Sequence, residues 1–469
     1  MKDSYDLIII GGGAGAFSAA IKANSLKAKT LMINDGLPLG GTCVNVGCVP
    51  SKTLIHAAEL VHNSKNHGVS GLQFDIKEAD FAKIIADEQE LVEKMRSKKY
   101  EDVLNGIENV KYLEGHATFV DNSTIEVSGE QYNASKIIIT TGSRTRVPEI
   151  AGLKEAGYMT HIDVVKQGTL PKSLAVIGAG AQGLEWGQMF ARFGSEVTIL
   201  QRSERILTKA VDSEAANRLQ GILVDEGINI VTNAQSKSVN NVDGKKQITY
   251  EVNGVEKTLL VDEILLASGR TPNTDNLNIQ ASGVELSDSG AIKVSDTFKT
   301  SVSHIFAVGD VASLPLRQET TAGREGTLAA ANALNDEDNS IDYDTVPFAV
   351  FTSPQLAGVG LTEEEQMKRY NSCLCRSVQL DAVPKAGITR QTEGIFTISA
   401  NPKTEVIEGM TIVAPHASEL IAEVMMIVKN KNTIDDVTNT IPMFPTISEG
   451  IKYAALSFKN DISKLSCCV

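Results

Sequence analysis

The six cysteines of this 469-residue chain are the first residues whose types and spacing suggest chemistry. Six are too few for the disulfide framework of a secreted protein of this size. Close pairs in a chain without a signal peptide are typical of redox or metal chemistry instead, and they favour a cytoplasmic location. The three close pairs are Cys43/Cys48, Cys373/Cys375 and Cys467/Cys468.

The first pair lies in a glycine-rich segment and is the most specific signal in the chain. On a regular helix, residues five apart have Cα atoms roughly 8–9 Å from each other, whereas a disulfide tolerates at most about 7 Å. Cys43 and Cys48 can therefore be bridged only where the first helical turn is distorted, which Asn45 and Gly47 make easier. Thiols held near a helix N-terminus should have lowered pKa values and react as thiolates. The alternative is a pair of buried cysteines that only pack.

The elements that must position a cofactor against these thiols are two strand–turn–helix units with one plan. Each has an apolar strand, then a turn of the form G-x-G-x-x-G/A, and then a helix. The glycines of such a turn let the backbone approach a pyrophosphate at the helix N-terminus, where free N–H groups and the helix dipole favour an anion. Two separate copies predict two bound dinucleotides, at Gly11, Gly13, Ala16 and at Gly178, Gly180, Gly183.

The residues after the second strand of each unit indicate which dinucleotide is bound. In the first unit, Asp35 can accept a hydrogen bond from a ribose 2′-OH, although Asn34 is the alternative for that position. In the second unit the position is Gln201, with Arg202 and Arg205 close behind. Because the guanidinium group matches phosphate geometry, we predict NADPH rather than NADH. The alternative is two solvated surface arginines.

Charge and hydropathy restrict the partners of the chain. The formal net charge of -14 argues against nucleic acid or an anionic membrane surface as the main partner. No apolar run approaches the roughly 20 residues that a membrane helix needs. After Thr345 the pattern changes to α+β without a glycine turn, and we expect this region to mediate dimerisation.

The segment from Gly41 to Lys52 resembles the redox-disulfide motif of the flavoprotein disulfide reductases, which include dihydrolipoamide dehydrogenase, glutathione reductase and mercuric reductase. The resemblance covers essentially the whole chain. Further segments resemble the turns where the chain leaves and re-enters the FAD domain, the second FAD motif, and the opening of the interface domain; they are Thr141-Gly142-Ser143, Gly269-Arg270, Gly309-Asp310 and Val350 to Gln355.

The resemblance implies an α/β fold with two Rossmann-like dinucleotide-binding domains, for FAD and NADPH, and a C-terminal α+β dimerisation domain. We expect the FAD-binding domain in residues 1–148 and 273–345, the NADPH-binding domain in 149–272 and the dimerisation domain in 346–469. Gly41, Thr42 and Lys52 are implied to lie in the FAD site with the motif residues already named.

The resemblance also implies a path for electrons, from NADPH through FAD to the Cys43–Cys48 disulfide. Cys48 is the thiolate in contact with the flavin, and Cys43 is the thiol that meets the substrate. Lys52 and Glu185 resemble the residues that lie near the flavin N5 on the nicotinamide side.

Two features favour mercuric reductases within this family. Disulfide-reducing members carry a histidine near the C-terminus that protonates the leaving thiolate, and Phe444 occupies its place here. The tail pair Cys467/Cys468 supplies two thiolates, which a soft ion such as Hg(II) prefers. We therefore predict a homodimer that reduces Hg(II), supplied as a thiol complex, with the tail passing the metal to Cys43 and Cys48.

Departures from the family pattern leave alternatives open. Mercuric reductases use two tyrosines near the metal; Tyr100 matches the first, but the second aligns with Phe444. Cys373/Cys375 match no family role, and we expect them to be structural rather than metal-binding. The competing interpretations are a thioredoxin-reductase-like or dihydrolipoamide-dehydrogenase-like disulfide reductase, and a flavoprotein that sequesters metal with its thiols.

Overall fold

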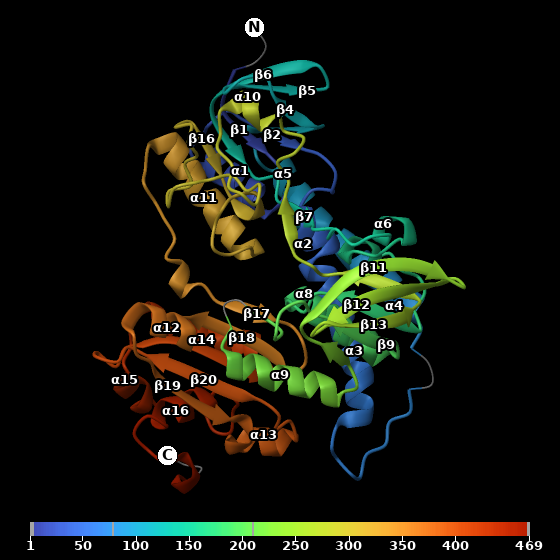
Figure 1. The fold of residues 1–469 in the computed structure, drawn as a ribbon. Helices are drawn as coiled ribbons and strands as arrows, with labels where there is room; N and C mark the ends of the chain where they lie inside the picture. The colour runs from blue at the N-terminus through green and yellow to red at the C-terminus, as the bar shows by residue number, and fades with distance from the viewer. Residues whose placement is uncertain (1–3, 77–78, 209–210, 467–469) are drawn as a thin grey trace. The chain divides into compact units, whose positions relative to one another are not determined.

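The computed structural model describes residues 4–76, 79–208 and 211–466 (Figure 1). The chain divides into two compact units, which we describe one at a time. Unit 1 comprises Met1–Thr53, Ile85–Arg146 and Gly269–Tyr343, and unit 2 comprises Leu54–Ile84, Val147–Ser268 and Asp344–Val469.

Unit 1 is built on a seven-stranded sheet with the order β3-β2-β1-β6-β5-β4, in which β16 also pairs with β6. The pairs β1–β2, β1–β6, β2–β3 and β6–β16 are parallel, whereas β4–β5 and β5–β6 are antiparallel. The strands are β1 (Ser4–Ile10), β2 (Thr30–Asn34), β3 (Val110–Glu114), β4 (Ala117–Phe119), β5 (Thr124–Val127), β6 (Glu130–Ile139) and β16 (Ile305–Ala307).

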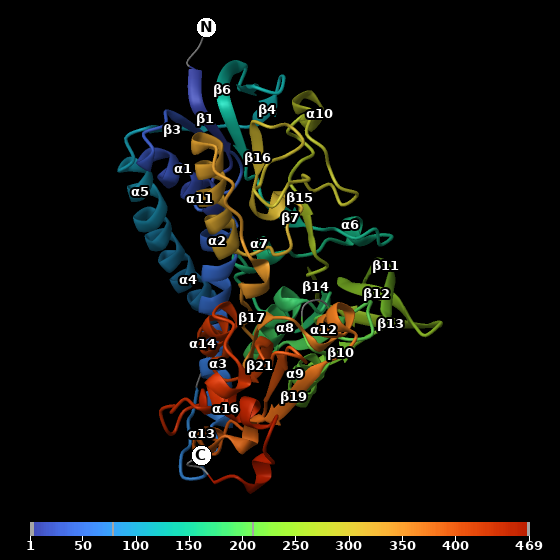
Figure 2. The same ribbon diagram turned by 90° about the vertical axis from the view of Figure 1, so that its left-hand side faces the viewer.

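The strand β1 is apolar on both faces because both faces are covered, as is usual in parallel sheets. Ile8 and Ile10 belong to the core on one face, and Leu7 and Ile9 to the core on the other. On the second face, helices α1 (Ala14–Ser25) and α11 (Glu319–Asn335) lie side by side (Figures 1 and 2). They approach so closely that a Cβ on Gly326 would lie 2.2 Å from the carbonyl oxygen of Gly15.

Unit 2 contains a four-stranded parallel sheet with the order β10-β9-β8-β14. Its strands are β8 (Ser173–Ile177), β9 (Glu196–Leu200), β10 (Asn229–Val231) and β14 (Glu263–Leu266). Helix α8 (Ala181–Phe193) connects β8 to β9, so the βαβ unit predicted from the second glycine turn is present. An antiparallel sheet of β11 (Ala234–Val242), β12 (Lys245–Val252) and β13 (Val255–Val261) follows α9 (Ser213–Asp225) and β10.

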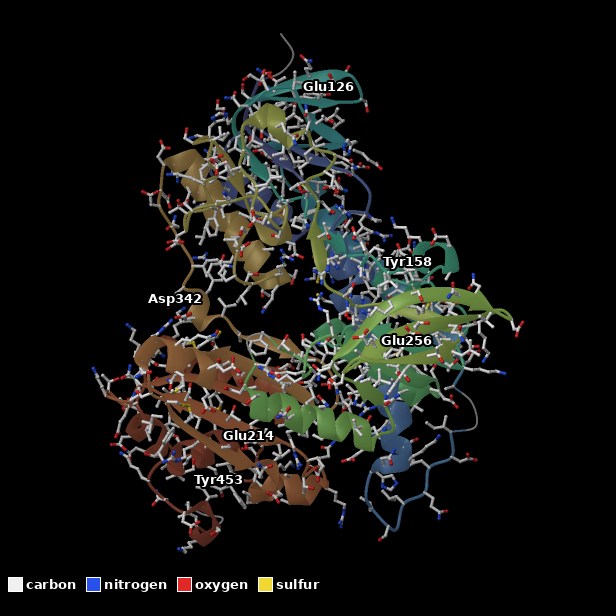
Figure 3. All side chains as sticks on the ribbon, viewed as in Figure 1. Glu126, Tyr158, Glu214, Glu256, Asp342 and Tyr453 are labelled. Atoms are coloured by element: carbon white, nitrogen blue, oxygen red, sulfur yellow. A yellow bond between two sulfur atoms is a disulfide. The ribbon has the colours of Figure 1, made fainter. Side chains whose placement is uncertain are left out.

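The C-terminal part of unit 2 is an antiparallel five-stranded sheet with the order β17-β18-β21-β20-β19. Its strands are β17 (Phe348–Val350), β18 (Gln355–Gly360), β19 (Leu374–Gln379), β20 (Ile395–Ala400) and β21 (Ile407–Ala414). Buried residues of this sheet share one core with α14 (Ala417–Lys429) and α16 (Glu449–Leu456), to which Tyr453 belongs (Figure 3). Among the described residues, no helix is long and apolar enough to cross a membrane.

Several shorter or connecting elements complete the described chain. The helices are α2 (Gly41–Val46), α3 (Cys48–Asn66), α4 (Phe81–Arg96), η1 (Ser97–Glu101), α5 (Asp102–Asn105), α6 (Leu153–Ala156), α7 (His161–Val164), α10 (Ile279–Ser282), α12 (Glu363–Tyr370), α13 (Pro384–Thr389) and α15 (Ile434–Thr438). The short 3-10 turns are η2 (Gly309–Val311), η3 (Tyr343–Thr345), η4 (Leu380–Ala382) and η5 (Ile462–Lys464). Strands β7 (Ser143–Thr145) and β15 (Arg270–Pro272) pair antiparallel in unit 1.

Candidate redox site

The helix that carries Cys43 and Cys48 is interrupted between them, as their spacing requires. Helix α2 ends at Val46 and α3 begins at Cys48, because Gly47 leaves the helical region with φ -124° and ψ -108°. A Cβ on Gly47 would lie 2.8 Å from the carbonyl oxygen of Thr42, so a larger residue would force this turn apart. The predicted distortion of the helix is therefore present, and it brings the two sulfur atoms within hydrogen-bond reach.

The two cysteines are free in the structure, without a disulfide between them, and they differ in exposure. Cys48 is exposed, while Cys43 is half-buried. The hydrogen bond with the sulfur of Cys48 raises the pKa of Cys43 strongly, and burial adds to this effect. The expectation that the helix terminus lowers the pKa of both thiols is therefore wrong for Cys43. The reason is that the hydrogen bond with the neighbouring sulfur and the burial of Cys43 both favour its protonated form.

Asn45 fixes the loop that precedes the redox pair. Its side-chain Nδ2 donates to the carbonyl oxygen of Gly41 at 2.8 Å and to those of Pro38 and Leu39 at 3.1 Å. Its Oδ1 accepts from Nη1 of Arg96 at 3.2 Å. A polar side chain with these partners is stabilising in a buried position, so Asn45 holds α2 in place rather than only permitting its distortion.

Tyr100 lies close to the redox pair. The π-helical turn η1 presents its ring edge-on to Phe17, with ring centroids 4.9 Å apart. A Cβ on Gly40 would lie 2.9 Å from Cδ2 of Tyr100, so the glycine makes room for the ring. Burial raises the pKa of Tyr100 to about 12, and the negative charges of Glu319, Cys43 and Cys48 contribute.

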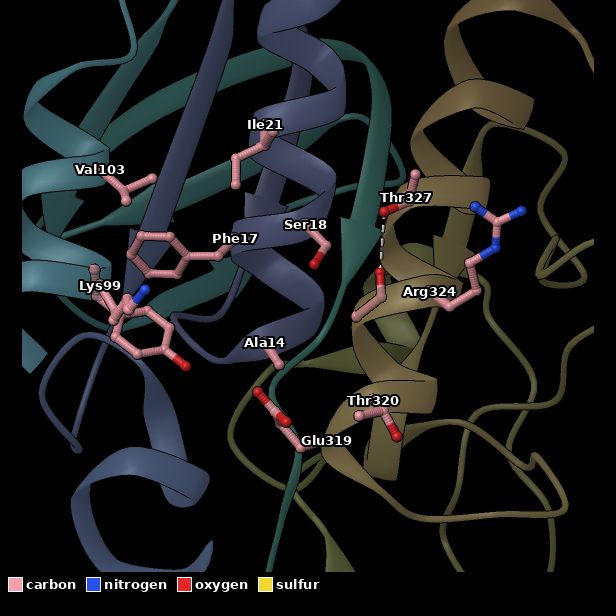
Figure 4. Close-up of a pocket in the computed structure, with 12 residues that line it drawn as sticks. Ala14, Phe17, Ser18, Ile21, Lys99, Val103, Glu319, Thr320, Arg324 and Thr327 are labelled. Atoms are coloured by element: carbon pink, nitrogen blue, oxygen red, sulfur yellow. Dashed lines mark hydrogen bonds between the residues drawn. The ribbon is translucent and has the colours of Figure 1, made fainter. Parts of the chain in front are cut away.

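A cavity of about 550 Å³ opens beside Tyr100 in unit 1 (Figure 4). Its walls come from α1, from the η1–α5 segment and from the first turns of α11, and they include Phe17, Lys99 and Glu319. The carboxylate of Glu319 also raises the pKa of Cys43. Glu319 was not predicted from the sequence, because no sequence signal connects it with a thiol pair more than 270 positions away.

The first glycine turn leaves room for a phosphate group. Gly11 has φ +136°, and a Cβ there would lie 2.3 Å from the carbonyl oxygen of Thr140. At Gly13 the nearest atom to such a Cβ is 3.9 Å away. Gly13 caps α1 without a side-chain hydrogen bond, and the first turn, which contains Ala16, has no acidic residue. The helix N-terminus therefore offers free N–H groups to an anion.

The two candidates for the ribose contact take different positions. Asn34 is buried at the end of β2, and a Cβ on Gly12 would lie 2.4 Å from its Oδ1. Its Nδ2 donates to the carbonyl oxygen of Leu37 at 3.0 Å. Asp35 is exposed, and its carboxylate lies 2.9 Å from Nδ1 of His116. Asn34 is thus the one that packs against the glycine turn.

The segments named for the FAD domain meet at Ser143. Its hydroxyl donates to Oδ2 of Asp310 at 2.5 Å and accepts from Nε of Arg270 at 2.6 Å. Asp310 follows Gly309, whose N–H donates to Oε2 of Glu325 at 2.7 Å. Glu325 is fully buried, and its other oxygen accepts from the hydroxyl of Tyr343 at 2.9 Å.

Hydrogen bonds also join the two segments where the chain is predicted to leave and re-enter the FAD domain. The hydroxyl of Thr141 donates to the carbonyl oxygen of Asn273 at 2.8 Å, and the N–H of Asn273 donates to that of Gly142. The N–H of Arg146 donates to the carbonyl oxygen of Gly269 at 2.9 Å. These bonds hold the Thr141–Ser143 and Gly269–Arg270 motifs in register.

The second glycine turn is closed at two positions and open at the third. A Cβ on Gly178 would lie 2.4 Å from the carbonyl oxygen of Ala267, and one on Gly183 would lie 2.0 Å from that of Gly178. At Gly180 a Cβ would meet no atom within 4 Å. Gly180 caps α8 without a side-chain bond or an acid in the first turn, so this helix N-terminus also fits a phosphate.

The polar residues after β9 are not equivalent. Oε1 of Gln201 accepts from the N–H of Ala179 at 3.2 Å, which ties it to the glycine turn. Nη1 of Arg205 donates to the carbonyl oxygen of Leu207 at 2.8 Å. Arg202 is exposed, so it is the better placed of the two arginines to meet a ligand from solvent.

The remaining predicted residues are distributed over both units. Lys52 is half-buried on α3 in unit 1. Glu185 is buried on α8 in unit 2, and its Oε1 accepts from the N–H of Phe351 at 2.8 Å. Phe444 is 49% exposed in unit 2. Cys467 and Cys468 lie outside the described residues.

Comparisons with known proteins show the family of the chain. Residues 5–334 match the family model for pyridine nucleotide-disulphide oxidoreductases, and residues 346–455 match the dimerisation domain of the same family. The chain belongs to the pyridine nucleotide-disulphide oxidoreductases. The predicted family and fold class are confirmed, and with them the use of a flavin and a pyridine nucleotide and the presence of a dimerisation domain.

Individual relatives and a solved structure are also similar to the chain. The chain is 41% identical over 467 residues to a mercuric reductase of Lysinibacillus sphaericus, covering 100% of this chain and 85% of the relative. It is 40% identical to a mercuric reductase of Bacillus cereus, covering 99% and 73%. Among solved structures it resembles the Cu(II) complex of the HOCl-induced flavoprotein disulfide reductase RclA from Escherichia coli, at 27% identity and a TM-score of 0.86, covering 97% and 100%.

Proposed function

We propose that this protein is an NADPH-dependent mercuric reductase that converts Hg(II) to Hg(0). The reaction balances as NADPH and Hg(II) giving NADP⁺, a proton and Hg(0). The observation that carries the proposal is the Cys43/Cys48 dithiol at a broken helix, with Tyr100 and an open cavity beside it. The relatives named as mercuric reductases, 34–41% identical over nearly the whole chain, support the choice of substrate.

The cofactor sites follow from the two open helix N-termini. We assign FAD to residues 1–148 and 273–345, where α1 receives the pyrophosphate and Asp310, held by Ser143 and Glu325, meets the ribityl chain. We assign NADPH to residues 149–272, where Arg202 meets the 2′-phosphate. The bound flavin supplies the two-electron link between the nicotinamide and the thiols. We assign dimerisation to residues 346–469, through which two copies of the chain form a homodimer.

The thiols act as metal ligands as well as electron carriers. A soft, two-coordinate cation prefers two thiolates, and thiols must lose their protons to bind it. Cys48 is exposed and meets the incoming thiol complex first, whereas Cys43 keeps its proton until the metal replaces the shared hydrogen bond. The carboxylate of Glu319 lies near Cys43 and favours the approach of a cation.

The tail and the cellular location complete the proposal. Cys467 and Cys468 are two adjacent thiols that can take Hg(II) from a small thiol and pass it to Cys43 and Cys48 by ligand exchange. We assign the enzyme to the cytoplasm, where thiols stay reduced.

The second candidate is a disulfide reductase, and Phe444 argues against it. Protonation of a leaving thiolate needs a group such as imidazole, and a phenyl ring carries no proton. Reduction of Hg(II) to Hg(0) needs no such donor.

NADPH oxidation by the purified protein tests the proposal. HgCl2 with an excess of small thiol is compared with oxidised glutathione and lipoamide as the electron acceptor. Turnover with Hg(II) alone, abolished in Cys43→Ser, supports the proposal. Turnover with a disulfide but not with Hg(II) refutes it.

The tail is tested separately. Cys467→Ala/Cys468→Ala should lose turnover at limiting thiol and keep it when free thiol is in excess. A mixture of this variant with Cys43→Ala should regain activity through mixed dimers, and a mixture that stays inactive contradicts transfer between subunits.

A further inference from the structure

The pair Cys373/Cys375 lies at the edge of the five-stranded sheet and has no part in the proposed reaction. Cys373 directly precedes β19 and Cys375 is its second residue, and β19 is an edge strand. Cys373 is thus next to the strand rather than in it, and the two Cα atoms are 5.6 Å apart. The structure joins the two residues as a disulfide, and their Cα separation lies within the range that a disulfide spans. Both are only half-buried, which leaves them accessible to solvent.

Buried polar groups fix the position of this pair. The sulfur of Cys375 lies 3.9 Å from Oε1 of Gln366, whose side chain is fully buried on α12. Nε2 of Gln366 donates to Oε2 of Glu408 at 3.0 Å. The other oxygen of Glu408 accepts from the hydroxyl of Tyr370 at 2.7 Å. Because each polar group in this hydrogen-bonded series has a partner, Cys375 is held at a fixed place on the sheet.

Two further residues of the same strand indicate which face carries Cys375. Ser377, two residues beyond Cys375, donates to the carboxylate of Glu214 on α9 (Figure 3). Val378 points the other way and belongs to the core under α14 and α16. Cys375 therefore lies on the face with α9 and α12, away from the hydrophobic core.

The number of ligands selects the kind of ion. Among the described residues, no group of three or more cysteine, histidine, aspartate or glutamate side chains could hold a metal together. Structural zinc needs four nitrogen or sulfur ligands, and Ca²⁺ and Mg²⁺ need sets of oxygens. Two thiolates at this sheet edge form a complete set of ligands only for a soft cation that binds two ligands.

We propose that reduced Cys373/Cys375 is a second binding site for Hg(II), separate from the redox pair and without a role in its reduction. The inference rests on the proposed function only for the identity of the cation. Two small thiols first reduce the Cys373–Cys375 disulfide and leave as their own disulfide. The dithiol then exchanges with a mercury bis-thiolate, forming two protein Hg–S bonds and releasing two small thiols. Because both ligands are on one chain, the pair outcompetes single thiols through its effective concentration.

This expectation departs from the structural role that the sequence suggested for the pair. A purely structural disulfide in a protein interior is shielded from small thiols, whereas these cysteines are half-buried at a sheet edge. Exposed disulfides are the ones that are reduced most readily.

The chain has six cysteines, so the pair can be isolated by mutation. The full-length variant Cys43→Ser/Cys48→Ser/Cys467→Ser/Cys468→Ser keeps only Cys373 and Cys375. After treatment with small thiol and HgCl2 and removal of unbound metal by gel filtration, we expect about one Hg per chain. The matched control adds Cys373→Ser/Cys375→Ser and should retain none, with flavin absorbance verifying that both variants are folded.

Either of two results would overturn the inference. One is equal mercury retention by both variants. The other is an absence of mercury from the first variant, whether titration finds its two thiols free or finds that they resist reduction. The assay contains no NADPH and its variants lack the redox pair, so its outcome is independent of turnover. If the wild-type enzyme fails to oxidise NADPH with Hg(II) while the pair binds Hg(II), the proposed reaction fails and the binding site stands.

Discussion

Replacing Glu88 with glutamine changes how the stability of the protein depends on pH. Glu88 lies on α4 with only 1% of its side chain exposed, and its Oε2 has no hydrogen-bond partner in the described structure. A carboxylate without a partner is expensive to bury. Burial accordingly raises the pKa of Glu88 from 4.5 to about 7.

The size of the effect follows from the two pKa values. Between pH 4.5 and about 7, the folded chain holds a proton that the unfolded chain has released. Stability therefore falls as pH rises, by about 1.4 kcal/mol for each pH unit. Over the whole interval the loss is about 3 kcal/mol, and above pH 7 it no longer grows. Glutamine does not titrate, so the variant lacks this loss.

The assay is unfolding by urea and by heat for both proteins at several pH values from 5 to 8.5. The free energy of unfolding of Glu88→Gln relative to the wild type should rise by about 2.5 kcal/mol across this range, because the range begins half a pH unit above the lower pKa. Glu93→Gln, an exposed position on the same helix, should follow the wild type throughout. The reasoning is refuted if Glu88→Gln and the wild type lose stability in parallel, because the carboxyl would then be ionised at little cost in the folded state.

Other substitutions test the cofactor sites. In Gly183→Ala the new Cβ would lie 2.0 Å from the carbonyl oxygen of Gly178, so this variant should have a lower melting temperature and a KM for NADPH raised more than about tenfold. In Gly180→Ala the new Cβ has open space around it, so this variant should keep its melting temperature and show only the raised KM for NADPH. Glu325→Gln leaves one amide oxygen for the two donors that the carboxylate serves, the N–H of Gly309 and the hydroxyl of Tyr343, and flavin fluorescence should show an increase of about tenfold in the dissociation constant of FAD; an unchanged value would mean that these bonds do not hold Asp310. Arg202→Gln should raise KM for NADPH about tenfold and leave KM for NADH unchanged, and an equal effect on both would contradict the 2′-phosphate contact. Phe444→Tyr should increase Hg(II)-dependent turnover by about fivefold if the missing hydroxyl limits the rate, which steady-state NADPH oxidation would show.

The sequence by itself determined the features that depend on neighbouring residues. The two glycine turns were predictable because φ angles such as +136° at Gly11 and +110° at Gly178 are open to glycine and costly for other residues. The break between Cys43 and Cys48 was predictable because helix geometry forbids their contact without it. The parallel strand–helix units followed from the same local patterns, since a strand, a glycine turn and a helix in succession build a parallel sheet, whereas the full domain arrangement was implied by the family resemblance.

Tertiary structure alone decided the surroundings of these motifs. Glu319 and Glu325 reach the thiol pair and the Asp310 turn from α11, and nothing in their local sequence marks them for either place. The pKa of Cys43 depends on its hydrogen bond with Cys48 and on burial, so the helix terminus could not predict it. The partner of Arg205 is a loop carbonyl and that of Asp35 is His116. Charge and hydrogen bonding act through space, and the distances that control them are set by how the whole chain packs rather than by the order of its residues.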